Sequence, residues 1–278
     1  MKKSIAAILA GALCLSALTA CGGSTSSSDS SAAANTGDSD KVITVGATPT
    51  PHAEILNAAK DALEAEGYTL KVVEFTDYVQ PNTALVDGDL DANYFQHTPY
   101  LNNFNKENGT DLVAAFDMHY EPFGIYAGKT ASLDELSDGA VIGIPNDPTN
   151  EGRALLLLEA QGLITLDDSS NLSATPNNIV DNPKNLQFEE IEAQTLPSSR
   201  PDLDLAVINS NYALGAGLNP TTDALAIESG DSPYVNVLVV KEGNEDNPAI
   251  QALVEALHSD TIRDFINEEF DGAVVPAF

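Results

Sequence analysis

The residue that most strongly suggests binding chemistry is Arg153, inside the stretch PNDPTNEGRALLLL at residues 145–158. An apolar run before this stretch predicts a buried strand, and the residues after Arg153 are strong helix formers. With Asn150 as the predicted N-cap, Arg153 falls in the first helical turn, where the helix dipole already concentrates positive charge. A guanidinium there is unfavourable for the helix but suits an anion such as a carboxylate. The alternative is a surface arginine paired with Asp147 or Glu151.

Other polar side chains occupy comparable positions. Tyr78 and Asn209 come directly after predicted strands, where open α/β sheets bind their ligands. Asn236 lies inside a predicted strand, where asparagine is unfavourable for packing, and this favours a functional role. Tyr94 and Phe95 are neighbours on another strand, so alternation leaves open which of them faces a pocket and which faces the core.

The elements that position these residues alternate between strand and helix. Strands are predicted over residues 41–48, 68–75, 92–96, 112–116, 141–144, 186–191, 203–208 and 234–241. Helices are predicted over residues 52–66, 132–136, 150–162, 248–257 and 259–266, with short helices opening near residues 98 and 212. This order predicts an α/β fold with two lobes, each a mainly parallel sheet flanked by helices.

The first forty residues are expected to lie outside the fold. Residues 1–20 have a basic start and a short apolar run, which is typical of a cleaved signal peptide. Leu18-Thr19-Ala20-Cys21 matches a bacterial lipobox, so Cys21 is the predicted lipidation site. Residues 21–40 are rich in serine, alanine and aspartate and predict a flexible tether. The expected location is the extracytoplasmic face of the cell membrane, held by a lipid anchor.

Composition narrows the classes of function. The formal net charge is −30, which disfavours nucleic acid and anionic lipid surfaces as partners. Of the two cysteines, Cys14 leaves with the signal and Cys21 is acylated, so the mature domain is expected to have no disulfide and no thiol chemistry. No common catalytic motif is present, which argues against an enzyme. A metal-binding lipoprotein remains an alternative if His97 and His119 meet in space.

Four segments carry a resemblance to a known family. PNDPTNEGRALLLLEAQGLI, DANYFQHTPYL, AVINSNYALGAGL and DSPYVNVLVV resemble the methionine-binding lipoproteins of bacterial ABC importers, also described as NlpA-type lipoproteins. The resemblance covers residues 41–278. It implies a periplasmic-binding-protein fold with lobe 1 at residues 41–122 plus 237–278 and lobe 2 at residues 123–236. The crossing segments would lie near residues 120–126 and 234–239.

The resemblance also implies a ligand and a role for each site residue. L-Methionine would bind between closing lobes, the alternatives being another amino acid or a short methionine-containing peptide such as Gly-Met. Arg153 would take the carboxylate as a bidentate pair, and Asn209 and Asn236 would fix the carboxylate or the ammonium. The remaining implied site residues are Tyr78, Tyr94, Phe95 and His97, lining the side-chain pocket, and Asn150, which also serves as the helix cap. The implied partners are a permease with its ATPase; the protein would be a monomer with no metal and no cofactor.

Overall fold

A computed structural model describes residues 41–230 and 232–278. The predicted signal peptide, the lipidation site Cys21 and the tether at residues 21–40 lie outside the described residues. Within the described part, no helix has both the length and the apolar character needed to cross a membrane.

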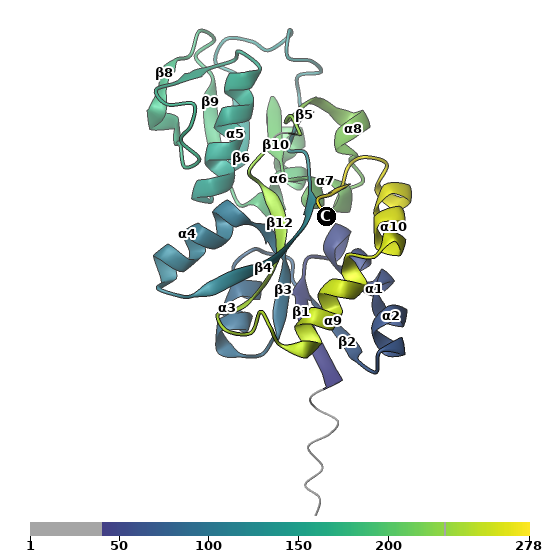
Figure 1. Cartoon of the computed structure of the whole chain (residues 1–278). Coiled ribbons are helices and arrows are strands. Elements are labelled where there is room, and N and C mark those ends of the chain that lie inside the picture. The colour runs from purple at the N-terminus through teal and green to yellow at the C-terminus, as the bar shows by residue number, and fades with distance from the viewer. Residues whose placement is uncertain (1–40, 231) are drawn as a thin grey trace, which may run out of the picture. The chain divides into compact units, whose positions relative to one another are not determined.

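One sheet has six strands, in the order β13-β4-β12-β3-β1-β2 (Figure 1). Its strands are β1 (Val42–Ala47), β2 (Thr69–Glu74), β3 (Ala92–His97), β4 (Leu112–Tyr120), β12 (Val235–Lys241) and β13 (Val275–Pro276). One face packs against α1 (Glu54–Ala58), α2 (Lys60–Ala65), α9 (Pro248–Leu257) and α10 (Asp260–Phe270) through a continuous apolar cluster. The other face carries α3 (Gln80–Asp87) and α4 (Thr98–Asn108) over a smaller cluster.

The second sheet has five strands, in the order β11-β5-β10-β6-β9. They are β5 (Gly124–Ala127), β6 (Val141–Pro145), β9 (Gln187–Ile191), β10 (Leu205–Ile208) and β11 (Ala224–Ile227). Helix α5 (Pro148–Ala160) covers one face, and α6 (Leu196–Ser199) with α7 (Ser210–Gly215) covers the other. The remaining elements are α8 (Pro220–Asp223) and the hairpin of β7 (Thr165–Leu166) and β8 (Ile179–Asp181).

The chain passes from one sheet to the other twice. It leaves the six-stranded sheet after β4 and returns with β12, and β5 is the first strand of the intervening part. Strand β5 runs antiparallel to both of its neighbours, and so does β12. Two parallel neighbouring strands need a crossover connection, usually a helix, and a strand that enters from the other sheet has none. Each sheet therefore contains both parallel and antiparallel strand pairs. The α/β fold with helices flanking two sheets is confirmed. The prediction that each sheet is mainly parallel is wrong, because antiparallel pairings are at least as many as parallel ones in both sheets.

Two local predictions are wrong. The helix predicted over residues 132–136 is absent, and these residues form bends and turns. Five residues gain too few hydrogen bonds to offset the cost of starting a helix, even with a favourable cap. The helix predicted over residues 52–66 is instead a π-helical turn, η2 (Pro49–Ala53), followed by α1 and α2, which meet at Ala59.

Candidate functional site

A cavity of about 20 Å³ is lined by residues of β3, β12 and α5 and of segments that follow strands of both sheets. That space holds about one water molecule, so a ligand the size of an amino acid requires the lining side chains to move apart. Seven of the eight predicted ligand-binding residues line it: Tyr78, Phe95, His97, Asn150, Arg153, Asn209 and Asn236. The structure therefore brings together residues that are up to 158 positions apart, from Tyr78 to Asn236.

The start of α5 differs from the prediction. The N-cap is Asp147, whose carboxylate accepts a hydrogen bond of 3.0 Å from the backbone N–H of Asn150. Proline at the next position, Pro148, suits the first helical residue because it has no N–H to satisfy. Asn150 is thus the third helical residue and not the cap, and Arg153 is the sixth. The dipole argument for Arg153 weakens accordingly, since that field acts mainly on the first turn.

Arg153 is buried and paired with a distant carboxylate. Its Nε donates to Oε2 of Glu228 at 3.0 Å, and its Nη2 donates to the backbone oxygen of Glu121 at 2.8 Å. The ring of Tyr234 lies 4.4 Å from the guanidinium carbon. The alternative of a surface pair with Asp147 or Glu151 is wrong. Burial alone would lower the pKa of Arg153, but Glu228 raises it above its usual value, so the guanidinium stays charged.

Asn150 connects two other predicted residues. Its Oδ1 accepts hydrogen bonds from Nδ2 of Asn209 at 2.8 Å and from Nε2 of His97 at 3.1 Å. The other ring nitrogen of His97 accepts from the backbone N–H of Tyr100, so His97 both caps α4 and lines the cavity. Burial, with the nearby Arg153, lowers the pKa of His97 to about 3. The imidazole is therefore neutral and orients Asn150 and Asn209.

Asn209 has a side-chain oxygen, Oδ1, in the cavity wall that makes no hydrogen bond among the described residues. Its side chain is buried. A buried acceptor left unpaired costs about 1–3 kcal/mol. The orientation of this amide is fixed by the bond from its Nδ2 to Asn150, so Oδ1 is held ready for a donor on a ligand.

An aromatic cluster forms another part of the wall. The ring of Tyr78 lies 5.9 Å from that of Phe95 and 5.8 Å from that of Tyr100, and its hydroxyl donates to Oδ1 of Asn211 at 2.6 Å. The prediction that Tyr94 lines the cavity is wrong, because alternation along β3 turns its side chain into the core of the six-stranded sheet. There the Tyr94 hydroxyl hydrogen-bonds Nδ1 of His119.

The sequence did not point to six of the residues that line the cavity. They are His52, Gln96, Tyr100, Glu121, Ser210 and Asn211. Two signals could have found three of the six. Gln96 is a polar residue inside a predicted strand, and Ser210 and Asn211 continue the polar strand end that starts at Asn209. Glu121 had no such signal, since acidic residues are abundant throughout the chain.

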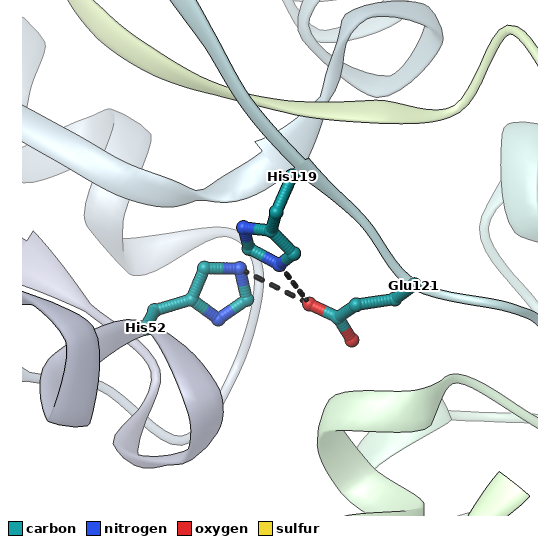
Figure 2. A group of neighbouring side chains, drawn as sticks. All are labelled: His52, His119 and Glu121. Atoms are coloured by element: carbon teal, nitrogen blue, oxygen red, sulfur yellow. Dashed lines mark hydrogen bonds and ion pairs between the residues drawn. The ribbon is translucent and has the colours of Figure 1, made fainter. Parts of the chain in front are cut away.

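Three of the buried side chains form a compact group, His52, His119 and Glu121 (Figure 2). Oε1 of Glu121 lies 2.7 Å from Nε2 of His119 and 3.4 Å from Nε2 of His52. The alternative of a metal site on His97 and His119 is not the grouping found here: among the described residues, the group that contains His119 includes His52 and Glu121 but not His97. His52 also donates to Oδ1 of Asn236 at 3.1 Å, which ties the group to a cavity residue.

The protonation of this group follows from its outer contacts. Nε2 of His119 faces the carboxylate of Glu121 and Nε2 of His52 faces Oδ1 of Asn236, and both oxygens are acceptors, so each Nε2 carries a proton. The Nδ1 atoms then accept from the hydroxyls of Tyr94 and Thr48, the latter at 2.7 Å. Burial lowers the pKa of His52 to about 4 and that of His119 to about 3. Burial raises the pKa of Glu121, while His52 and Arg153 oppose that rise.

Comparisons with known proteins agree with this architecture. The family model described as "NlpA lipoprotein" matches residues 43–278. The methionine-binding lipoprotein MetQ of Bacillus subtilis is 48% identical over 242 residues, which is 85% of this chain and 88% of that protein. The D-methionine-binding lipoprotein MetQ of Escherichia coli is 46% identical over 220 residues, 78% of this chain and 81% of that protein.

A solved structure adds a bound ligand to the comparison. A nutrient-binding protein from Burkholderia cenocepacia, described as bound to methionine, matches with a TM-score of 0.82 and 45% identity over 85% of this chain and all of that chain. Both the family model and these relatives span nearly the whole described part of the chain, and so include both sheets and the cavity. This chain belongs to the NlpA lipoprotein family.

Proposed function

We propose that this protein is the substrate-binding lipoprotein of an ABC importer and that it captures methionine in the cavity between its two sheets. The observation that carries the proposal is the cavity itself. It combines a buried, charged arginine, an unpaired amide oxygen and an aromatic wall around one small cavity. The names of the relatives, which bind methionine or D-methionine, support the same ligand.

In this proposal the carboxylate of methionine binds Arg153. Nε and Nη2 of Arg153 already donate to Glu228 and to the backbone of Glu121, whereas Nη1 has no hydrogen-bond partner within the described part of the chain. The carboxylate therefore binds through Nη1, and the bidentate geometry predicted from the sequence requires Glu228 to move. The amide of Asn236 is a second donor, because its oxygen is already engaged by His52.

The side chain of methionine packs against Tyr78, Phe95 and Tyr100. A thioether gains about 0.3–1.5 kcal/mol from each good contact with an aromatic ring. Leucine would pack against the same rings without the gain from the thioether. We therefore expect the binding free energies of methionine and leucine to differ by only about 1–3 kcal/mol. Another amino acid, or a short peptide that ends in methionine, is the alternative ligand.

Capture and delivery would follow from the two crossings between the sheets. We propose lobe 1 at residues 41–122 plus 237–278 and lobe 2 at residues 123–236, moving as hinged bodies about the two connections. The closed form would dock as a monomer on a permease and its ATPase. A lipid on Cys21 would hold the protein on the extracytoplasmic face of the membrane, with residues 21–40 as the tether.

Calorimetry on the purified protein tests the proposal. The protein is first unfolded and refolded to remove carried-over ligand, then titrated with L-methionine, D-methionine, leucine, glutamine and Gly-Met. We expect one methionine enantiomer to bind at least about tenfold more tightly than leucine, in line with a pocket difference of about 1–3 kcal/mol. Tighter binding of another amino acid or of Gly-Met would replace the ligand and keep the transport role. No binding by any of the five would contradict the proposal.

A further inference from the structure

Two segments that follow β2 and β10 meet beside the cavity and link elements of the two sheets. The hydroxyl of Tyr78 donates to Oδ1 of Asn211 at 2.6 Å. The hydroxyl of Tyr212 donates in the opposite direction, to the backbone oxygen of Thr76 at 3.1 Å, and the rings of Tyr78 and Tyr212 lie 4.9 Å apart. Thr76 and Tyr78 follow a strand of the six-stranded sheet, whereas Asn211 and Tyr212 belong to α7, which covers the five-stranded sheet. We call these four residues the tyrosine clamp.

Each half of the tyrosine clamp is held by its own surroundings. On one side, the hydroxyl of Tyr100 donates to the backbone oxygen of Tyr78 at 3.0 Å. On the other side, α7 begins at Ser210, whose hydroxyl donates to the backbone oxygen of Pro122. The clamp therefore joins two anchored segments, and separating them moves backbone as well as side chains.

The tyrosine clamp lies between the cavity and two grooves on the surface. One groove, of about 400 Å³, has Thr76, Asn211 and Tyr212 in its wall. The other, of about 510 Å³, has Thr76 and Tyr78 in its wall. Tyr78 and Asn211 also line the cavity, whereas Tyr212 does not. A ligand that leaves the cavity toward either groove therefore has to pass the clamp.

The size of the cavity makes such a passage depend on the clamp. The cavity has room for about one water molecule, so an amino acid enters or leaves only when the walls move apart. In the proposed complex the polar end of the ligand binds Arg153 and Asn236, and neither belongs to the clamp. The hydrogen bonds of the clamp are made between protein groups alone, so breaking them costs the same free energy whichever ligand is enclosed.

We propose that the tyrosine clamp holds the cavity closed and sets the rate at which ligands enter and leave it, with Tyr212 as a positioning residue that acts through Thr76 and Tyr78. This inference rests on the proposed function and adds control of ligand exchange to it. The ring of Tyr78 remains a contact for the ligand side chain, while its hydroxyl belongs to the clamp. The clamp thus governs rates without choosing between ligands.

The rate of ligand release tests the inference. Protein loaded with radiolabelled methionine is mixed with excess unlabelled methionine, and the label that stays bound is followed by rapid filtration. Tyr212→Phe removes one clamp hydroxyl outside the cavity, and Tyr78→Phe removes the other while keeping the ring in the wall. We expect each variant to release methionine about twofold to tenfold faster, as for the loss of one hydrogen bond, and to take it up at least as fast as wild type. Release of leucine should accelerate by the same factor.

A matched control separates the clamp from a general effect of losing a tyrosine hydroxyl. Tyr68 lines neither the cavity nor the two grooves, so Tyr68→Phe should release methionine at the wild-type rate. Unchanged release in Tyr212→Phe would overturn the inference. Acceleration for methionine but not for leucine would also overturn it, because the hydroxyl would then act on the ligand and not on closure. If Tyr78→Phe does not fold, Tyr212→Phe alone decides.

Failure of the proposed function gives a different result from failure of the clamp. If wild type binds another amino acid in place of methionine, release of that amino acid is measured, and the same comparison decides. If no amino acid binds, the proposed function fails and the clamp is tested without a ligand. Small-angle X-ray scattering should then give a larger radius of gyration for the double variant Tyr78→Phe/Tyr212→Phe than for wild type. An equal radius would overturn the clamp.

Discussion

The two charged side chains that line the cavity, Arg153 and Glu121, differ in the groups that compensate for their burial. Arg153 has a full counter-charge, Glu228, which also accepts a hydrogen bond from the hydroxyl of Tyr120 at 2.8 Å. Glu121 instead has two neutral imidazoles and a backbone N–H. The first group is a buried ion pair in which Nη1 has no partner among the described residues. The second is a carboxylate held by hydrogen bonds, and burial raises its pKa.

This difference bears on the proposed binding of the ligand carboxylate. In the proposed complex the carboxylate meets a guanidinium whose field Glu228 partly cancels, so a simple anion gains little from Arg153.

Replacing Arg153 should have the largest effect. Arg153→Ala removes the carboxylate donor and leaves Glu228 without its partner. Because breaking a buried ion pair costs about 3–5 kcal/mol, we expect methionine affinity to fall at least 100-fold and the unfolding midpoint to drop. Calorimetry and urea unfolding measure the two effects.

Arg263→Ala, which breaks an exposed pair with Asp260, is the matched control and should change neither quantity appreciably. Full methionine affinity in Arg153→Ala would contradict the carboxylate assignment.

Glu228→Gln tests the other half of the ion pair. It keeps the shape of the side chain but leaves the guanidinium buried without a counter-charge. We expect the free energy of unfolding to fall by roughly 3 kcal/mol. We also expect affinity for 4-(methylthio)butanoate to rise severalfold, because Arg153 is then freer to attract an anion. Urea unfolding and calorimetry are the measurements. Weaker binding of this anion by the variant than by wild type would contradict this expectation. Glu228 would then act mainly by holding the guanidinium of Arg153 in position, and less by reducing its attraction for anions.

Acid should destabilise the histidine group. His52 and His119 have folded pKa values of about 4 and about 3, below the unfolded value of about 6.5. The unfolded chain therefore binds more protons below pH 6.5, and stability is lost as the pH falls from there toward 4. The raised pKa of Glu121 acts in the opposite direction, and His97, whose pKa is lowered to about 3, adds to the loss. Urea unfolding at pH 7 and pH 4.5 measures it, and His52→Gln should reduce the difference. Equal stability at both pH values would count against buried, neutral imidazoles.

The smallest effect is expected at the aromatic wall. Phe95→Leu removes one ring from the proposed side-chain pocket. We expect methionine affinity to fall about twofold to tenfold, corresponding to the thioether–aromatic contact of about 0.3–1.5 kcal/mol. Leucine affinity should change less. Phe265→Leu, on α10 and outside the cavity, is the control. A larger loss for leucine than for methionine would place the ligand side chain elsewhere.

Local patterns in the sequence predicted much of this molecule. Strands such as 68–75 and 234–241 and the helix over 248–257 lie close to their predicted bounds, because hydrophobic periodicity and caps act over a few residues. The same locality explains the errors. Asn150 and Asp147 are both good caps three residues apart, and only the position of Pro148 and the full helix decide between them.

The sequence by itself determined the α/β class, the family resemblance and seven of the thirteen residues that line the cavity, because residue types and short motifs are local properties. Tertiary structure alone decided which distant groups meet. Glu228 reaches Arg153 across 75 positions, and His52 joins Glu121 and Asn236 through strands that are neighbours only in the folded sheet. It also turned Tyr94 into the core and Phe95 toward the cavity, since the face of a strand that is buried depends on what packs against it.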